Sequence, residues 1–458
     1  MKLNPLFPDN KTLGIFTDLY ELTMSAAFFE SGRHHQNATF ELFTRKLPGN
    51  RSFLIAAGLP QGLHYLLQAG FSESTIRYLR DQEAFAGARD EFFESLKDFQ
   101  FSGTVRALPE GTVFFAGEPI LQVTAPVMQA QIAETYLISA LNVQSMVATK
   151  AARLCEAAGG RPVVDFGTRR AHGPQAGLLA ARAAYMGGCA GTSNVLAGYH
   201  EGIPLYGTMA HSFVQFFESE EIAFRTFQRT FPDHSILLVD TYDTLEGVRK
   251  AISLRKPIQG IRLDSGNLLE LAKESRRLLD QAGLQEAKIF ASGNLNEEKL
   301  KRLHLENAPI DAYGVGTDLV VSTDAPGCDL VYKLVEVDRE GEPVPAYKTS
   351  EEKATLPFRK QIWRTTRDGK FQEDIIAVDG EAPIFREKTE TAPLLEAYIE
   401  QGRPVREPAS LEEARSRVQS QIKSLPESMR SLESPDSYPV RLSPRLQDFQ
   451  KRILKEER

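Results

Sequence analysis

Six short segments of the chain end in side chains that could bind or transform a ligand. Each begins as an apolar run and finishes in glycine, hydroxyl, carboxylate, guanidinium or imidazole groups. The finishing stretches are DFGTRRAHG (165–173), GTMAHS (207–212), DTYDT (240–244), RLDSGN (262–267), ASGN (291–294) and GVGTD (314–318). Turn chemistry alone is a poor explanation for six such ends in succession. The sequence therefore predicts one ligand site built from the ends of successive strands.

RLDSGN places a guanidinium, a carboxylate and a hydroxyl on one loop. Arg262 could grip a carboxylate or phosphate through its fork of N–H donors. Asp264 could hold sugar hydroxyls or a Mg²⁺-bound pyrophosphate. An ion pair between the two residues, with Asp264 also capping the next helix, explains the motif equally well.

ASGN and GVGT have the composition of phosphate-binding loops. Gly293, Gly314 and Gly316 would let the backbone approach an anion and direct its N–H groups toward it. Ser292 and Thr317 add hydroxyl donors. Either loop alone is better explained as a tight turn, but the pair on successive strands favours phosphate binding.

DFGTRR and GTMAHS add an aromatic ring, cations and a histidine. Phe166 could stack on a flat ring, and Arg169 or Arg170 could neutralise an anionic substrate. His211, with Thr208 three residues before it, could act as a base, a hydrogen-bond donor or a phosphoryl acceptor. The structural alternatives are a core phenylalanine beside solvated arginines and a histidine satisfied within the fold.

Several well-known site patterns are missing from the sequence. It contains no GxxxxGK[ST], HExxH or GxSxG stretch, so a P-loop nucleotide site is not supported. Cys155, Cys189 and Cys328 lack CxxC spacing, which argues against a zinc site and a disulfide framework.

The composition is that of an ordinary globular protein. Of 458 residues, 42% are hydrophobic and 25% are charged, which excludes a disordered chain or a fibrous repeat. A net charge of −7 without a basic patch argues against nucleic acid as a partner. No apolar run approaches the roughly 18 residues of a membrane span, and the opening residues lack a signal-peptide core. We expect a cytoplasmic protein without a membrane partner.

The elements that position these groups change character along the chain. Residues 1–125 read as an α+β domain, with a helix starting at Asp18 and strands separated by glycine or proline. Residues 126–335 begin with a long helix and continue as alternating strands and helices, which indicates a parallel sheet, open or closed into a barrel. One of the predicted strands is IPLYGT (203–208). Residues 336–458 return to strands and end in two amphipathic helices.

Taken together and in this order, the strand-end motifs resemble nicotinate phosphoribosyltransferase. The resemblance extends over most of the chain. It includes TDLYELTM, FTRKLPGNRSFLIAAGL, EGTVFFAGEPILQVTAP, YGVGTDLV and LPESMRSLESPDSYPVRLS. It implies the α/β class, as an irregular α/β barrel like that of type II phosphoribosyltransferases. An N-terminal α+β domain caps the barrel, and C-terminal segments pack back onto it.

The resemblance also implies a reaction and its partners. Nicotinate displaces pyrophosphate from 5-phosphoribosyl 1-diphosphate to give nicotinate mononucleotide, a step of NAD salvage. ATP serves as co-substrate through a transient phosphohistidine, Mg²⁺ is required, and the enzyme is a homodimer with sites at the interface. The sequence identifies no ligand set for the metal.

The resemblance assigns roles to individual residues of this chain. His211 matches the phosphohistidine, and Asp264 an acidic residue at the ribose or the metal-bound diphosphate. Tyr20, reaching across the dimer interface, joins the residues expected at nicotinate, which are Tyr20, Phe166, Arg169, Thr208 and Arg262. The residues expected at the phosphoribosyl diphosphate are Arg170, Ser292, Gly293, Gly314, Gly316 and Thr317.

Related enzymes and a non-enzyme remain as alternatives. Nicotinamide phosphoribosyltransferase would favour an acidic group near the amide, whereas Ser193 and Asn194 occupy that region here. Quinolinate phosphoribosyltransferase would be expected to carry a denser basic pocket. A ligand-binding protein on the same fold would hold the diphosphate without consuming it, and a sugar-phosphate lyase or isomerase would not explain GTMAHS beside DFGTRR.

Overall fold

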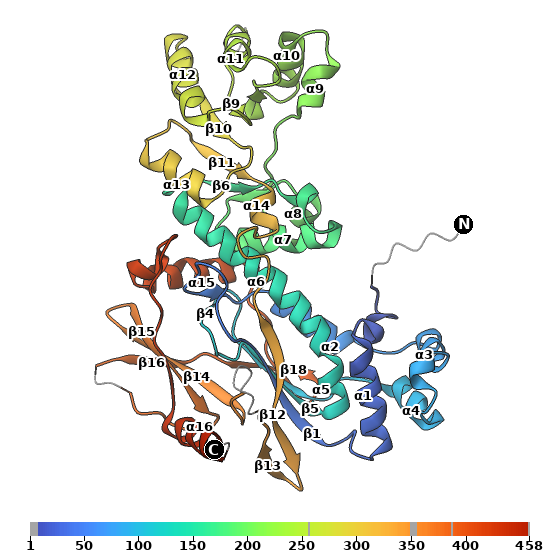
Figure 1. Cartoon of the computed structure of the whole chain (residues 1–458). Coiled ribbons are helices and arrows are strands. Elements are labelled where there is room, and N and C mark those ends of the chain that lie inside the picture. The colour runs from blue at the N-terminus through green and yellow to red at the C-terminus, as the bar shows by residue number, and fades with distance from the viewer. Residues whose placement is uncertain (1–7, 255–256, 349–354, 386–387, 457–458) are drawn as a thin grey trace. The chain divides into compact units, whose positions relative to one another are not determined.

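The computed structural model describes residues 8–254, 257–348, 355–385 and 388–456 (Figure 1). The chain divides into two compact units, one formed by Met1–Ser145 with Gly327–Arg458 and the other by Met146–Pro326. This division differs from the predicted boundaries after residues 125 and 335. Strand β12 (Leu330–Arg339) pairs with β1 (Asn37–Thr44), and helix α5 (Val127–Ile132) packs against α1 (Leu19–Glu30), so these segments belong with the first unit.

The first unit is built on a seven-stranded antiparallel sheet in the order β13-β12-β1-β5-β3-β17-β18. A four-stranded sheet, β16-β14-β15-β19, and the pair β2-β4 complete its strands. The remaining strands are β2 (Leu54–Ile55), β3 (Thr104–Ala107), β4 (Val113–Phe114), β5 (Leu121–Pro126), β13 (Glu342–Pro345), β14 (Lys360–Arg367), β15 (Lys370–Val378), β16 (Glu390–Pro393), β17 (Glu396–Glu400), β18 (Arg403–Pro404) and β19 (Val440–Leu442).

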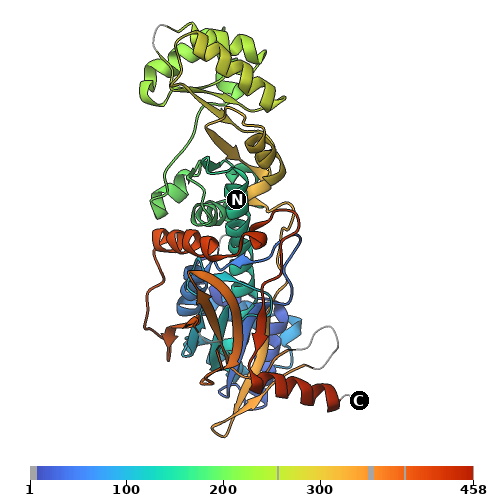
Figure 2. The same cartoon turned by 90° about the vertical axis from the view of Figure 1, so that its left-hand side faces the viewer.

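Helices of the first unit enclose an apolar core made by residues such as Leu22, Phe92 and Met128. The C-terminal helix α16 packs on β15 and β19, as Figure 2 shows in dark red. Besides α1 and α5, the helices are α2 (Leu59–Gln68), α3 (Glu73–Arg80), α4 (Asp90–Ser95), α15 (Leu411–Ser424) and α16 (Pro444–Glu456). None of the helices in the described part of the chain is long and apolar enough to cross a membrane.

The second unit contains a six-stranded parallel sheet in the order β7-β6-β11-β10-β9-β8. Its strands are short and largely buried, as expected for a parallel sheet covered by helices. The strands are β6 (Val163–Asp165), β7 (Gly191–Thr192), β8 (Ile236–Leu238), β9 (Gly260–Leu263), β10 (Lys288–Ala291) and β11 (Ala312–Val315). Among the described residues, the edge strands β7 and β8 do not pair with each other, so hydrogen bonds do not close the sheet into a full barrel.

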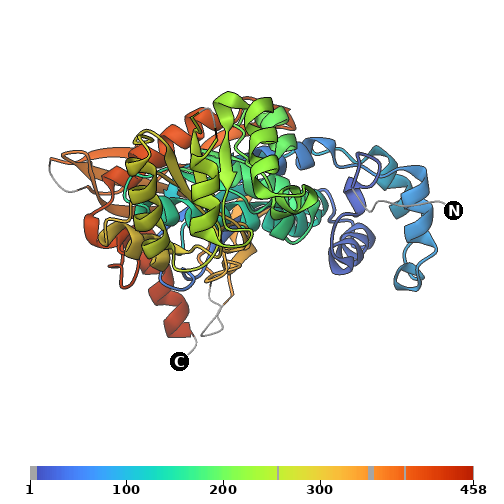
Figure 3. The same ribbon diagram turned by 90° about the horizontal axis from the view of Figure 1, so that it is seen from above.

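The helices of the second unit follow their strands in sequence. Helices α10, α11 and α12 lie side by side (Figure 1, Figure 3), and α12 packs on β9 and β10. The helices are α7 (Pro174–Met186), α8 (Val195–Glu201), α9 (His211–Phe216), α10 (Glu220–Thr230), α11 (Thr244–Ile252), α12 (Leu268–Gln281), α13 (Glu297–Leu305) and α14 (Thr317–Val320). The division between the units falls within α6 (Glu134–Ala157).

One predicted strand of this unit is wrong. IPLYGT contributes a single parallel bridge, between Leu205 and Thr192, rather than a strand. The edge strand is β7 instead, a glycine and a threonine that lack the apolar run by which strands are predicted.

Glu21 is a buried carboxyl group on α1 of the first unit. Its Oε1 accepts hydrogen bonds from the backbone N–H (3.1 Å) and the hydroxyl (2.6 Å) of Thr135. Burial is the main cause that raises the pKa of Glu21, to about 8, and the charges of Glu134 and Asp18 act in the same direction. At neutral pH this carboxyl group is therefore mostly protonated.

Replacing Glu21 by glutamine is expected to flatten the pH dependence of stability. Since the pKa of Glu21 is raised on folding, the folded state holds more protons than the unfolded chain between about pH 4.5 and 8. The free energy of unfolding must then fall as the pH rises through that window. Urea denaturation gives the free energy of unfolding at pH 5 and at pH 9. Its decrease between these two pH values should be about 1–3 kcal/mol smaller for Glu21→Gln than for the wild type. Glu91→Gln, an exposed glutamate of the same unit, is the control, and an equal decrease in Glu21→Gln and wild type would contradict the expectation.

Candidate active site

A cavity of about 660 Å³ lies in the second unit at the carboxyl ends of its parallel strands. All of the predicted site residues except Tyr20 line it: Phe166, Arg169, Arg170, Thr208, His211, Arg262, Asp264, Ser292, Gly293, Gly314, Gly316 and Thr317. The topology explains this convergence, because the same ends of neighbouring parallel strands meet at one edge of the sheet.

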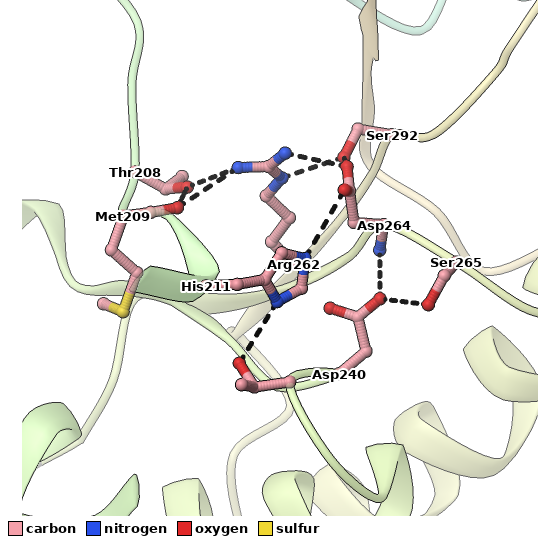
Figure 4. A network of polar contacts seen from close by, with 9 residues as sticks. Thr208, Met209, His211, Asp240, Arg262, Asp264, Ser265 and Ser292 are labelled. Atoms are coloured by element: carbon pink, nitrogen blue, oxygen red, sulfur yellow. Dashed lines mark hydrogen bonds and ion pairs between the residues drawn. The ribbon is translucent and has the colours of Figure 1, made fainter. Parts of the chain in front are cut away.

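Arg262 on β9 is the centre of a polar network in this cavity (Figure 4). Its Nε donates to Ser292 Oγ at 2.8 Å, and its Nη2 to Asp264 Oδ1 at 2.7 Å. Its Nη1 donates to Thr208 Oγ1 at 3.1 Å and to the Met209 carbonyl at 3.3 Å. The ion pair expected as an alternative is therefore present. Arg262 ties three strand-end loops together.

The aromatic group of DFGTRR packs against this arginine. The Arg262 guanidinium carbon lies 5.5 Å from the centre of the Phe166 ring, and that ring stacks on Phe290 with centres 5.4 Å apart. A Cβ at Gly314 would come within 2.6 Å of the Phe166 ring. Gly314 is thus required for this packing, a reason different from the anion approach that the sequence suggested.

Asp264 is an ionised carboxylate within the network. Burial raises its pKa, but the Ser292 hydrogen bond and the Arg262 charge outweigh burial and lower it overall. Gly293 holds the neighbouring loop against it at φ +93°, where a Cβ would lie 1.8 Å from the Asp264 carbonyl oxygen. Asp264 does not cap the following helix, because α12 begins after Asn267. The carboxylate therefore faces the cavity and its basic groups.

His211 is the first residue of α9 and stands between two polar partners. Its Nδ1 lies 3.2 Å from Thr241 Oγ1, and its Nε2 lies 3.7 Å from Asp264 Oδ2. The side chain is 42% exposed, so the ring can meet a ligand in the cavity. The hydrogen bond at Nδ1 orients the ring and places Nε2 near the Asp264 carboxylate, an arrangement that suits a nucleophilic or acid–base histidine.

Asp240, after β8, is a site-supporting residue that the sequence reasoning did not select. Its Oδ2 accepts hydrogen bonds from the Asp264 backbone N–H (3.0 Å) and from Ser265 Oγ (2.6 Å). Its Oδ1 is buried and has no hydrogen-bond partner among the described residues. The DTYDT motif predicted a polar strand end here. The structure adds that the Asp240 carboxylate is hydrogen-bonded to two residues of the RLDSGN loop.

Arg169 and Arg170 carry positive charges that no carboxylate among the described residues neutralises. Both are exposed in the 3₁₀ helix Thr168–Arg170, and within the described residues neither forms an ion pair. Arg262, in contrast, is engaged by neighbouring groups on all sides. The cavity therefore presents two guanidiniums to an anionic ligand.

Ser193 and Asn194 have separate tasks. Ser193 is exposed and lines the cavity, whereas Asn194 is buried and caps α8 by accepting the Ala197 N–H at 2.9 Å. Buried Asp165 positions this region, since its carboxylate accepts from Gly167 N at 2.8 Å and from Thr192 Oγ1 at 2.7 Å.

Tyr20 belongs to the first unit and is not among the residues that line this cavity. It lies in the first turn of α1 and is 46% exposed. Burial and the nearby Glu134 raise the pKa of its hydroxyl, so the phenol is neutral. Its predicted contact with nicotinate stays a prediction.

Comparison with known proteins identifies the family. The chain is 46% identical over 440 residues to nicotinate phosphoribosyltransferase pncB2 of Mycobacterium tuberculosis, covering 94% of this chain and 92% of that protein. The chain belongs to the nicotinate phosphoribosyltransferase family. The enzyme of that name from Bacillus subtilis is 36% identical, with 94% and 93% of the two chains covered. The resemblance found in the sequence is thus confirmed.

The match to the nicotinate phosphoribosyltransferase family extends to its domains and its fold. The nicotinate phosphoribosyltransferase (NAPRTase) N-terminal and C-terminal domain families match residues 15–142 and 383–450. The quinolinate phosphoribosyl transferase C-terminal domain family matches residues 147–330, which contain the cavity. The structure of human nicotinic acid phosphoribosyltransferase is similar with a TM-score of 0.83, 30% identity, and 96% and 100% of the two chains covered. The predicted α/β fold is therefore confirmed.

Proposed function

We propose that this enzyme transfers the 5-phosphoribosyl group from 5-phosphoribosyl 1-diphosphate to nicotinate, forming nicotinate mononucleotide and pyrophosphate in NAD salvage. The observation that carries the proposal is one cavity that joins two unpaired arginines, Arg169 and Arg170, to the network of Arg262, Asp264 and His211. Both substrates are anionic, and the cavity offers them cations. The names of its full-length relatives support the same reaction.

In the transfer, the ring nitrogen of nicotinate attacks C1 of the ribose. The bond between C1 and the diphosphate oxygen breaks, and pyrophosphate leaves with the bonding electrons. Positive charge that develops on the ribose is stabilised by ionised Asp264. Arg170 and the loops at Ser292–Gly293 and Gly316–Thr317 hold the phosphates, while Phe166, Arg169, Thr208 and Arg262 border the nicotinate.

Magnesium fits this site as a companion of the diphosphate substrate. Mg²⁺ commonly binds through one or two carboxylates together with substrate phosphates. Asp264 lines the cavity and would supply such a carboxylate, and Asp240, whose buried Oδ1 has no described partner, lies directly behind it. The described residues contain no cluster of three or more metal-binding side chains. When bound, the ion neutralises charge on the leaving pyrophosphate.

ATP acts as co-substrate through His211 in this proposal. A ring nitrogen of His211 attacks the γ-phosphorus of ATP, the bond to the bridging oxygen breaks, and ADP leaves. Water later hydrolyses the phosphohistidine to orthophosphate and restores the imidazole. Asp264 and Thr241 hold the ring on its two sides for this attack. ATP would use the same phosphate loops as the diphosphate, since the sequence has no P-loop.

A homodimer completes the proposal. Helix α8 and the segment after it expose large apolar side chains, including Val195 at 70% and Tyr199 at 82%. Leu205 and Tyr206 are exposed nearby, and a Cβ at Gly198 of α8 would touch Leu205. Such a patch suits an interface between copies, with Tyr20 contributing to the site of the partner subunit. Light scattering that returned the 51.0 kDa mass of one chain would contradict the dimer.

The decisive experiment measures product from nicotinate, 5-phosphoribosyl 1-diphosphate and Mg²⁺, with and without ATP. Nicotinamide replaces nicotinate in a parallel reaction. Mononucleotide from nicotinate, accelerated by ATP and accompanied by ADP, is the expected result. Product from nicotinamide alone would overturn the substrate, and no product from either would favour a binding protein.

We further place the enzyme in the cytoplasm, where its ATP and sugar diphosphate substrates are made.

Replacing Ser193 by aspartate is expected to shift the preference away from nicotinate. The new carboxylate would line the cavity beside the carboxylate of nicotinate, and like charges repel, whereas an amide can donate to it. We expect kcat/KM for nicotinate to fall about tenfold or more, while the ratio of nicotinamide to nicotinate turnover rises. Ser193→Asn, similar in size but neutral, is the control. Equal losses in the two variants would show that charge at this position does not discriminate.

A further inference from the structure

Lys150 on α6 is a fully buried lysine that joins three carboxylates of the second unit. Its side chain is 1% exposed. Its Nζ lies 2.5 Å from Glu297 Oε2, 2.6 Å from Asp318 Oδ2 and 2.9 Å from Asp324 Oδ1. Burial lowers the pKa of Lys150, but the three carboxylates outweigh burial and raise it overall. The ammonium is therefore charged at neutral pH.

Asp318 lies in the cavity wall, and the other two carboxylates directly follow residues of that wall. Glu297 follows Asn296, Asp324 follows Thr323, and both Asn296 and Thr323 line the cavity. Asp318 lines the cavity itself and directly follows Thr317 of the second glycine loop. One ammonium group thus joins the wall segment at residues 292–296 to the wall segment at residues 314–323. None of these three carboxylates takes part in the Arg262 network of Figure 4.

The negative charge of Asp318 would repel a phosphate ligand unless a nearby cation offsets it. An anionic ligand at Ser292, Gly293, Gly316 and Thr317 would meet a carboxylate at the same end of the cavity. The 2.6 Å contact with Lys150 draws that carboxylate toward the buried ammonium, which offsets part of its charge, and Arg153 Nε, 3.5 Å from Glu297 Oε1, adds a second cation to the cluster. Removing one partner of a buried ion pair leaves the other charge uncompensated, which is strongly unfavourable.

We propose that Lys150 is a positioning residue for the phosphate end of the cavity, where it offsets the charge of Asp318 and fixes the loops that receive the diphosphate substrate. The identity of that ligand rests on the proposed function. The role differs from that of Arg169 and Arg170, because Lys150 does not line the cavity and acts only through Asp318, Glu297 and Asp324.

The test compares Lys150→Met with two double variants. Lys150→Met/Asp318→Asn removes the carboxylate that lines the cavity. Lys150→Met/Asp324→Asn removes one that does not line it and is the matched control, since both double variants relieve the same amount of charge. Binding of Mg²⁺-loaded 5-phosphoribosyl 1-diphosphate and of Mg²⁺-pyrophosphate is measured by calorimetry, and KM values for both substrates are measured by turnover.

Lys150→Met is expected to raise the Kd for both phosphate ligands about tenfold or more, with the KM for nicotinate changed by less than about twofold. Asp318→Asn in that background should recover most of the affinity, whereas Asp324→Asn should not. If Lys150→Met alone does not fold, the affinities of the two double variants can still be compared with each other. Wild-type affinity in Lys150→Met, or equal affinities in the double variants, would overturn the inference. Failure of the wild type to bind either ligand would instead overturn the proposed function.

Discussion

Replacing Asp264 by asparagine is expected to lower kcat/KM for nicotinate mononucleotide synthesis by about 10²–10³-fold. The substitution preserves the shape of the side chain and removes its charge. Asp264 is ionised, and Oδ1 accepts hydrogen bonds from Arg262 and Ser292 while Oδ2 faces His211. In the proposed mechanism, a neutral amide would no longer stabilise positive charge on the ribose. It would also leave Arg262 without its ion-pair partner.

The measurement is steady-state turnover at saturating ATP, with thermal unfolding as a check on the fold. Asp280→Asn is the control, because Asp280 is a carboxylate of the same unit that pairs with Arg276 on the outside of α12. We expect that control to retain wild-type turnover. Asp264→Asn that kept kcat/KM within about threefold of wild type would exclude a direct electrostatic role.

The sequence predicted well which residues converge on one cavity, because parallel strands bring their carboxyl ends together. Polar residues after β6, β9, β10 and β11 could be assigned to one site without any knowledge of their contacts. These strands are short and mostly apolar, as expected for buried parallel strands, although β9 carries Arg262 within it. The edge of the sheet was harder to predict, since β7 consists of Gly191 and Thr192 and is a strand only through its pairing with β6.

Contacts between residues far apart in the chain could not be predicted. RLDSGN showed an arginine two residues before an aspartate, but not that Arg262 also binds Thr208 and Ser292. In the sequence Lys150 is one cation in a long helix, and its partner Glu297 lies 147 residues away. Glu21 likewise gives no local sign of burial, and only the assembled fold, in which Thr135 lies 114 residues away in the sequence, makes it a buried acid. Local pattern gives the type and order of elements, whereas such pairings depend on the assembled fold.

Replacing His211 by asparagine is expected to abolish coupling to ATP while leaving a slow transfer reaction. Asparagine keeps a polar side chain but offers no imidazole nucleophile, so formation of ADP should fall by at least about 10³-fold. Arg169, Arg170 and Asp264 remain in the cavity, and nicotinate mononucleotide should still form at a rate that ATP no longer increases. ATP labelled at the γ-phosphate, followed by counting of protein-bound phosphate, measures the first effect.

The matched control for this variant is His234→Asn, because His234 is an exposed histidine of the same unit outside the cavity. It should keep both labelling and ATP stimulation. Labelled protein in His211→Asn would place the phosphoryl acceptor elsewhere. Loss of transfer together with loss of ADP would mean that His211 serves the ribosyl transfer itself. His211 Nε2 lies only 3.7 Å from Asp264 Oδ2, so both side chains could act on the same ribose carbon in that case.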